Sequence, residues 1–268
     1  MNNIIKRTLT GIIFVAVLFG SIFFNQYTFF ALFLLITIGA INEYFTLIKE
    51  KIAPQRVLGT LCAASLFIAS FAHVNYAYYK IYAISLGLAF LIFIAELYRK
   101  KENPFNNIAH TLTGIFYTAI PFSALNYIVY WGGDTYLPTI LACIFILIWS
   151  NDTFAFIWGV SFGKHKLFER ISPNKSWEGS IGGGLSTIII AYFISRYITD
   201  IETVDWVIMA VIIVFTGSLG DLTESLLKRS LNIKDSGNIL PGHGGILDRF
   251  DALLIAIPFI FVFMLFKC

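Results

Sequence analysis

Charged side chains are scarce in this sequence. Asp, Glu, Lys and Arg make up 13% of its 268 residues, whereas hydrophobic residues, with tyrosine and cysteine included, make up 57%. A soluble domain contains about 25% charged residues, and its surface-to-volume ratio exposes a large share of the chain to water. The composition therefore excludes a soluble globular domain, a disordered chain and a nucleic-acid-binding protein, and it predicts an integral membrane protein.

Cysteine is also sparse, and no internal repeat or linker is visible. Cys62, Cys143 and Cys268 are odd in number and scattered, which excludes a disulfide framework or a cysteine metal site. We expect a single membrane domain over residues 1–268. Within it, 1–147 form a scaffold with lipid and subunit contacts, and 148–268 carry the functional motifs.

Nine apolar segments qualify as membrane spans. A spanning helix needs about 20 mostly apolar residues, because each adds about 1.5 Å across a hydrocarbon core of about 30 Å. The first segment follows Lys6 and Arg7 as in a signal peptide, but no small-x-small cleavage site follows, so we expect a retained helix. The segments are residues 9–24, 28–48, 57–72, 81–97, 108–131, 138–159, 179–195, 205–219 and 252–266.

The distribution of Lys and Arg predicts the orientation, because loops retained in the cytoplasm are enriched in these residues. With the N terminus inside and alternating spans, sixteen basic residues fall inside and three, Lys80, Arg196 and Lys267, fall outside. The sequence therefore predicts an all-α polytopic membrane protein with about nine transmembrane helices, a cytoplasmic N terminus, an outside C terminus and a polar site on the cytoplasmic side.

Residues 1–147 place their charges mostly at segment ends, whereas in residues 148–251 acidic and basic side chains crowd the cytoplasmic side and enter or adjoin the predicted spans. Asp152 lies inside the sixth segment, where an Asp at the helix centre costs about 2.5 to 3.5 kcal/mol on insertion scales. Either a cation from a neighbouring helix pairs with it, or it lines a polar pocket. Asn151 beside it adds a second oxygen and favours the pocket.

The basic loop before the seventh segment contains Lys175 and Ser176. They precede an apolar helix, whose unsatisfied N–H groups and positive dipole end favour an anion such as phosphate. A Walker A loop is excluded, because here the glycines follow the Lys–Ser pair. Gly179 and Gly183 are four residues apart and favour close approach of another helix. The functional candidates are therefore Lys175, Ser176 and Glu178.

Residues 220–251 hold the densest group of polar side chains. Asp221, Glu224, Ser225 and Lys228 recur at helical spacing and share one face at the end of the eighth segment. Glu224 and Lys228 could form an ordinary i,i+4 ion pair, whereas Asp221 directly follows an apolar run and is harder to explain in that way.

Asp248 and Asp251 lie three residues apart in the first turn of the ninth helix, where the helix dipole favours carboxylates. Capping of the helix N terminus would explain one of these two carboxylates. It explains less readily why both are present together with Arg249. The preceding loop is rich in glycine, and Gly244 and Gly245 allow backbone N–H groups to come close to a ligand.

Carboxylates from three predicted helices thus gather beside basic side chains. Hard oxygen ligands suit Mg²⁺, which prefers a few carboxylates plus substrate phosphates, and the cations match further phosphate oxygens. We therefore expect Mg²⁺ as the cofactor. The carboxylates are Asp152, Asp221, Glu224, Asp248 and Asp251, and the basic residues are Lys175, Lys228, Arg229, Lys234 and Arg249.

Three blocks form a pattern in a fixed order. The longest is Ser225-x-x-Lys228-Arg229, then Lys234-Asp235-x-Gly237, then Pro241-Gly242-His243-Gly244-Gly245-x-x-Asp248-Arg249-x-Asp251. The other two are Ser172-Pro173-x-Lys175-Ser176-x-Glu178-Gly179 and the run from Asp152-Thr153 to Gly163-Lys164. Together they resemble the phosphatidate cytidylyltransferases, also called CDP-diacylglycerol synthases. The chain departs from that family at Val160, Ser161 and Phe162, where members often carry a basic residue.

The resemblance implies transfer of CMP from CTP to phosphatidate, giving CDP-diacylglycerol and pyrophosphate for phospholipid biosynthesis. It also implies a multi-pass protein of the inner (plasma) membrane, a homodimer, and an active site facing the cytoplasm. Asp221 and Asp248 would hold the metal, with Asp152, Glu224 and Asp251 as further ligands. Lys228 and Arg249 would assist catalysis. The substrate-binding residues would be Lys175, Ser176, Glu178, Ser225, Arg229, Lys234, His243, Gly244 and Gly245.

Two alternatives remain at this stage. One is a CTP-dependent enzyme acting on another lipid phosphate, since its phosphate and metal motifs would look alike. The other is an ion or metabolite transporter, since buried carboxylates also mark transport pathways. Transporters often contain two related halves, and the polar cluster has no counterpart in residues 1–147.

Overall fold

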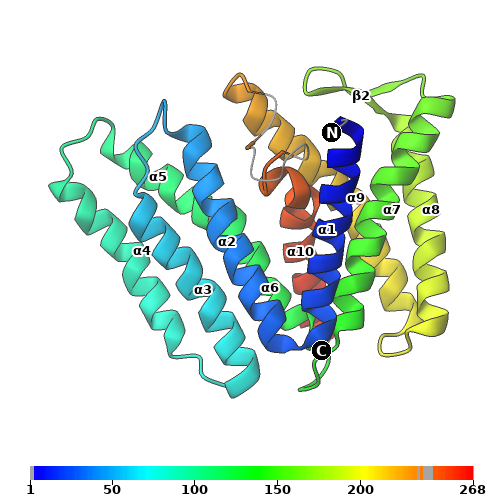
Figure 1. The fold of residues 1–268 in the computed structure, drawn as a ribbon, viewed down its shortest axis with the longest axis horizontal. Helices are drawn as coiled ribbons and strands as arrows, with labels where there is room; N and C mark the ends of the chain where they lie inside the picture. Colours follow the sequence, from blue (N-terminus) through cyan, green and yellow to red (C-terminus); the bar gives the residue numbers. More distant parts are fainter. Residues whose placement is uncertain (1–2, 234–235, 238–243, 268) are drawn as a thin grey trace. The chain divides into compact units, whose positions relative to one another are not determined.

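The computed structural model describes residues 3–233, 236–237 and 244–267. In this part of the chain the fold is helical apart from one short β-hairpin (Figure 1). The chain divides into two compact units, residues 1–137 with 233–250, and residues 138–232 with 251–268.

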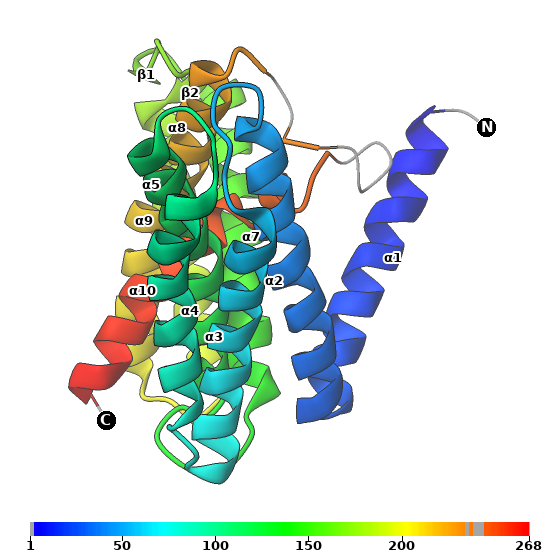
Figure 2. The same ribbon diagram turned by 90° about the vertical axis from the view of Figure 1, so that its left-hand side faces the viewer.

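The first unit contains the helices that precede residue 138. They are α1 (Asn3–Phe24), α2 (Gln26–Ile48), α3 (Arg56–Tyr76), α4 (Ile81–Tyr98), α5 (Pro104–Gly114), the π-helical turn η1 (Ile115–Ala119) and α6 (Ile120–Ile128). A capping box between Asn25 and Thr28 starts α2, because each side chain accepts a backbone N–H of the other residue. Figure 2 shows α3 and α4 running side by side.

Large aromatic side chains fill the interior of the first unit. Phe29, Phe33, Phe67 and Phe122 are fully buried. The segment before residue 251 returns to the same core, where Phe250 packs edge-on against Phe122 with ring centroids 5.4 Å apart. This return brings the end of the glycine-rich loop beside α2.

The second unit contains the elements that surround the polar residues. They are α7 (Pro138–Phe162), β1 (Lys166–Phe168), β2 (Ser172–Ser176), α8 (Trp177–Tyr197) and α9 (Thr203–Ser230); α10 (Leu247–Lys267) begins in the first unit and continues in this one. The basic loop expected between two spans is thus an antiparallel hairpin, which follows α7 and leads directly into α8 (Figure 1).

Eight of the nine predicted segments lie within a single helix each, while the fifth, 108–131, spans α5, η1 and α6 and runs past the end of α6 at Ile128. The helices are not all equally apolar. In the described residues, seven are long and apolar enough to cross a membrane. The apolar part of α1 is shorter, Thr8–Phe24, and glycines and serines dilute the apolar residues of α8. The structure therefore supports a multi-pass membrane protein, while the count of nine spans and the orientation of the termini stay predictions.

Glycines bring α7 and α8 into close contact, as their spacing predicts. A Cβ at Gly183 would lie 2.8 Å from the backbone nitrogen of Ala155, and one at Gly179 would lie 3.0 Å from the Cα of Gly159. Only a residue without a side chain fits at these positions, so the helix-packing interpretation of Gly179 and Gly183 is confirmed.

Gly183→Ala should destabilise the protein by about 1 to 3 kcal/mol, because the added methyl group meets the backbone of α7 rather than a flexible side chain. Thermal unfolding of the purified protein in detergent measures the effect as a lower Tm. The matched control is Gly217→Ala in α9, where the nearest atom, Ala252 Cβ, would lie at an ordinary 3.7 Å. An equal loss of stability in the two variants would contradict the packing argument.

Candidate functional site

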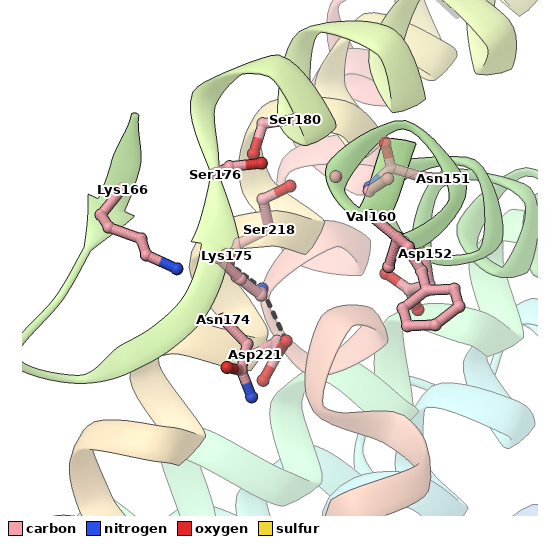
Figure 3. A pocket seen from close by; sticks show the side chains of 13 residues that line it. Asn151, Asp152, Val160, Lys166, Asn174, Lys175, Ser176, Ser180, Ser218 and Asp221 are labelled. Carbon is pink, nitrogen blue, oxygen red and sulfur yellow. Dashed lines mark hydrogen bonds and ion pairs between the residues drawn. The ribbon is translucent and has the colours of Figure 1, made fainter. Parts of the chain in front are cut away.

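A cavity of about 560 Å³ lies in the second unit, where the end of the hairpin meets α7, α8 and α9. Figure 3 shows that its polar side chains come from all four of these elements. The polar lining residues are Asn151, Asp152, Lys166, Asn174, Lys175, Ser176, Ser180, Ser218 and Asp221. This cavity brings together members of two of the three sequence blocks.

A lysine and an aspartate form the centre of this cavity. The Lys175 ammonium lies 2.5 Å from Asp221 Oδ2 and donates to the Ser218 carbonyl at 3.5 Å (Figure 3). Both side chains remain partly accessible, at 26% and 34%. The pair is therefore open to a ligand while each charge already has a counter-charge.

Ser176 caps the helix that follows the hairpin. Its hydroxyl accepts the Gly179 N–H at 3.2 Å, and its backbone is extended, as an N-cap residue requires. The same hydroxyl would lie 2.7 Å from a Cβ at Gly163. Ser176 therefore fixes the start of α8 and holds the neighbouring Lys175 at the cavity.

Two further carboxylates interact electrostatically with this pair. The charge of Asp152 on α7 interacts with those of Asp221, Asp251 and Lys175. Asp251 is brought to α9 by a close helix contact, since a Cβ at Gly220 would lie 2.5 Å from the Asp251 carbonyl oxygen. Asp152, Asp221 and Asp251 thus belong to three helices of the second unit, while the convergence of all the predicted carboxylates, Asp248 included, stays a prediction.

Behind Asp221 on α9 lies a buried ion pair. Glu224 is fully buried, and its carboxylate lies 3.2 Å from the Lys228 ammonium. The Glu224 side chain also interacts with that of Asp251 on α10. The i,i+4 pair considered from the sequence therefore exists, but it is buried rather than on the surface, and it joins α9 to α10.

The remaining α9 residues differ in their surroundings. Ser225 donates to Asp221 Oδ1 at 3.3 Å, which orients that carboxylate. Arg229 is exposed one position after Lys228. Ser225 thus acts on the cavity through Asp221, while Arg229 is accessible to a ligand on the outside of the helix.

Glu178 is directed toward the hairpin and is not among the residues that line the cavity. It accepts the Lys164 N–H at 3.1 Å and both the backbone N–H and the ring Nδ1 of His165, the latter at 2.6 Å. These hydrogen bonds, that of the His165 ring first, lower the pKa of Glu178 to about 2. The structure therefore gives Glu178 a role in closing the hairpin; its assignment to substrate binding stays a prediction.

The predicted residues around the start of α10 belong to the first unit. Asp248 Oδ2 accepts the Gly245 N–H at 2.8 Å and the backbone N–H and hydroxyl of Ser236 at 3.0 and 2.8 Å. Gly244 has a positive φ of 82°, which glycine adopts readily. Arg249 is exposed. Lys234 and His243 lie outside the described residues.

The whole chain matches one family model, the cytidylyltransferase family, over residues 5–267. This chain belongs to that family. It is 38% identical over 189 residues to the phosphatidate cytidylyltransferase of Haemophilus influenzae, a match that covers 67% of this chain and 65% of that protein. It is 34% identical over 190 residues to the phosphatidate cytidylyltransferase of Staphylococcus aureus strain COL, covering 67% and 68% of the two chains.

The cytidylyltransferase motifs leave out several residues that the structure places at the cavity. Lys166, Asn174 and Ser218 line it, although none was selected from the sequence. Lys166 and Asn174 lie in a segment whose sequence predicts a loop, so no periodicity indicates that the hairpin turns them toward the cavity. Ser218 precedes Asp221 by three residues and so shares its helix face, which was the available signal.

The cavity has the chemistry, though not a complete set of protein ligands, for a hard cation. The buried Asn151 Oδ1 lines the cavity without a hydrogen-bond partner in the described part of the chain. Within those residues, no group of three or more His, Cys, Asp or Glu side chains is close enough to hold a metal. Mg²⁺ commonly uses one or two carboxylates plus waters and substrate phosphates, so the donors present fit it.

The low pKa of Glu178 predicts how the hairpin responds to acid. A depressed carboxyl pKa stabilises the folded hairpin above the ordinary value of 4.5, and this stabilisation disappears as the pH falls through about 2. Pepsin cleavage within residues 163–177 should therefore rise over that pH interval in the wild type. At the upper end of that pH interval, Glu178→Gln should already be cleaved faster than the wild type. Glu169→Gln, in the same hairpin, should be cleaved as the wild type is. Equal cleavage of all three proteins would exclude this role for Glu178.

Proposed function

We propose that this cytidylyltransferase transfers CMP from CTP to phosphatidate, giving CDP-diacylglycerol and pyrophosphate. The observation that carries the proposal is the accessible Lys175–Asp221 pair in a cavity that Asp152 also lines. The names of the two bacterial relatives supply the substrates. The resemblance of the motif blocks supports the same reaction.

The reaction needs positioning more than a base. A phosphate oxygen of phosphatidate attacks the α-phosphorus of CTP, a new P–O bond forms, and the bond from that phosphorus to the β-phosphate oxygen breaks. The second pKa of a phosphomonoester is about 6, so the nucleophile is already ionised at neutral pH. The barrier lies in aligning two polyanions and stabilising the charge on the leaving pyrophosphate.

The cavity residues are suited to binding phosphate oxygens. Lys175 and Lys166 provide cations, and Asn174 provides an amide donor. In our proposal, the Lys175 ammonium donates to a substrate phosphate in place of part of its contact with Asp221. We assign the remaining sequence-predicted cations, Lys228, Arg229, Lys234 and Arg249, to the phosphates of the two substrates as a group.

Mg²⁺ is the cofactor we propose, and its ligands would come from the carboxylates. Asp221 and Asp152, with the free Asn151 oxygen beside them, are the candidates in the second unit. Asp248 stays a ligand assigned from the sequence, with Glu224 and Asp251 as further candidates. When bound, the ion would neutralise negative charge on the phosphate oxygens.

We further propose the inner-membrane topology that the basic residues indicate. The N terminus and the cavity would face the cytoplasm, where CTP is available, and α1 and α8 would complete nine spans. The phosphatidate acyl chains would stay in the bilayer while the headgroup enters between helices. Small-residue faces and the family resemblance support a homodimer.

Asp221→Asn should lower the rate of CDP-diacylglycerol formation by on the order of 100-fold, because it removes a carboxylate that would hold Mg²⁺ at the reacting phosphates. The assay incubates the purified protein with labelled CTP, phosphatidate and Mg²⁺ and counts lipid-linked label. Asp248→Asn tests the second assigned carboxylate in the same way. Absence of product from the wild type, or product formed only with an isoprenoid phosphate, would overturn the proposed substrate.

The matched control for that assay is Asp205→Asn. Asp205 lies on the same helix, is buried, and pairs with Lys267 at 3.4 Å near the start of α9. It is 16 residues from Asp221, about 24 Å along the helix. This variant should keep a rate close to that of the wild type. A similar loss in both variants would show that folding, rather than the cavity carboxylate, determines the rate.

Metal removal should abolish the activity reversibly. After treatment with EDTA, product formation should stop, and added Mg²⁺ should restore it. In the presence of CTP, Mg²⁺ at 100 times its Kd should also stabilise the wild type by about 2.7 kcal/mol, seen as a raised Tm, and should stabilise Asp221→Asn less. Full activity in EDTA would contradict the assignment of a metal.

A further inference from the structure

Glu43 is a buried acidic residue on α2 that lies outside all three motif blocks. Its side chain is 5% exposed, and it lies five residues before the end of α2. The negative end of the helix dipole disfavours a carboxylate there, and the apolar surroundings disfavour any charge. Such a group persists only where hydrogen-bond donors compensate for the lost water.

Those donors come from the segment that leads into α10. Glu43 Oε2 accepts the Ile246 N–H at 2.8 Å, and Oε1 accepts the Leu247 N–H at 3.0 Å. The Ser236 hydroxyl also lies within hydrogen-bonding distance of Oε1, and it shares its single proton between Glu43 and Asp248. Leu247 is the first residue of α10, so Glu43 satisfies N–H groups that have no partner within the helix.

Two motif glycines make room for this carboxylate. A Cβ at Gly245 would overlap both carboxylate oxygens of Glu43, and one at Gly237 would lie 3.1 Å from Oε2. The glycines therefore allow the backbone to approach Glu43 closely. The contact with Glu43 therefore explains why glycine occupies these two positions of the longest motif.

A serine joins Glu43 to Asp248. The Ser236 hydroxyl lies within hydrogen-bonding distance of Glu43 Oε1 and of Asp248 Oδ2, the latter at 2.8 Å. Asp248 also accepts the Gly245 N–H. One carboxylate from α2 and one from α10 thus organise the same short backbone segment.

We propose that Glu43 is a positioning residue for cytidylyl transfer, holding the first turn of α10 so that Asp248 and Arg249 take their working positions. This inference rests on the proposed function, because Asp248 and Arg249 are assigned to the reaction there. Glu43 touches neither substrate. It acts through the backbone of Ile246 and Leu247 and through Ser236.

A carboxylate is required because the two backbone N–H groups, of Ile246 and Leu247, each need an acceptor on a different oxygen. In Glu43→Gln one oxygen becomes an NH₂ group, which would face an N–H or hydroxyl donor. The first turn of α10 should then lose a fixed partner. A shift of about 1 Å in catalytic groups can cost on the order of 100-fold in rate.

The first test measures the contact without using activity. Hydrogen–deuterium exchange on the full chain in lipid nanodiscs should show faster exchange of residues 244–250 in Glu43→Gln than in the wild type. The matched control is Glu96→Gln. Glu96 is likewise a buried carboxylate of the first unit, accepting from Gln55 Nε2 at 2.6 Å and Asn107 Nδ2 at 2.9 Å, but it does not contact this segment. Unchanged exchange at 244–250 in Glu43→Gln would overturn the inference.

The second test separates positioning from stability. Glu43→Gln should lower kcat by about 10- to 100-fold with a smaller change in KM for CTP. Glu96→Gln should lower the Tm by a similar amount and keep kcat near the wild-type value. Equal kcat values in the two variants, at equal Tm, would reduce Glu43 to a purely structural role and overturn the inference.

The third test uses the overlap at Gly245. Gly245→Ala alone should lower kcat, because its methyl group displaces Glu43. In a Glu43→Ala background the space is free, so the same substitution should lower kcat by a smaller factor. Equal factors in the two backgrounds would show that the residues act independently and would overturn the inference.

These outcomes are distinguishable from failure of the proposed function. If the wild type forms no CDP-diacylglycerol, the kinetic tests give no rate while the exchange experiment still reports on the Glu43 contact. If Glu43→Gln exchanges faster but the wild type is inactive, the proposed cytidylyl transfer is rejected and the contact between Glu43 and the start of α10 is supported. If the wild type is active but exchange is unchanged in Glu43→Gln, the positioning role of Glu43 is rejected and the proposed cytidylyl transfer is supported.

Discussion

The structure depends on one physical constraint: a carboxylate among apolar helices must be met by donors or by a cation. Each buried acid satisfies it in a specific way. Glu224 has Lys228 on its own helix, Asp205 has Lys267, and Glu43 has three donors from a distant segment. Because an unpaired charge there would cost several kcal/mol, the partners of Asp205 and Glu43 determine which distant segment lies against each of these helices, whereas Glu224 is paired within α9.

Small residues determine where these pairings can form. Gly220 allows α10 to approach α9 closely enough for Asp251 to reach Glu224, and Gly245 allows a backbone N–H donor segment to surround Glu43. Lipid provides no hydrophobic force that would draw helices together, so close packing at small residues has to do so. The glycines and the acids of this chain are therefore parts of one arrangement.

The positions of the helices could be predicted from the sequence because they follow from apolar run length. The grouping of Asp152, Asp221 and Asp251 also followed from local pattern, since each lies in or beside an apolar run. Glu43 could not be found in that way. Its partners lie 193 to 204 residues away in sequence, and its only local signal is a single acid inside the second apolar run.

Glu178 shows a different limit of local reasoning. Its place after a Lys–Ser pair predicts a ligand-binding residue, a role that stays a prediction, but the sequence does not indicate that its carboxylate accepts from Lys164 and His165. Those donors are brought back by the hairpin, which is short and whose strands contain few of the residues that mark a strand in sequence. An exposed turn that folds back on a helix start is determined by tertiary contacts rather than by periodicity.

The charge balance of the cavity bears on how it could accept two phosphorylated substrates. Its lining contains two lysines, Lys166 and Lys175, and two aspartates, Asp152 and Asp221, so these side chains carry no net charge among them. Asp251 adds a negative charge that Asp152 senses. Lys175 already pairs with Asp221, so it gives little net attraction for a polyanion. A divalent cation at the aspartates would offset their negative charge and leave Lys175 available to phosphate, and this charge balance supports the Mg²⁺ that we propose.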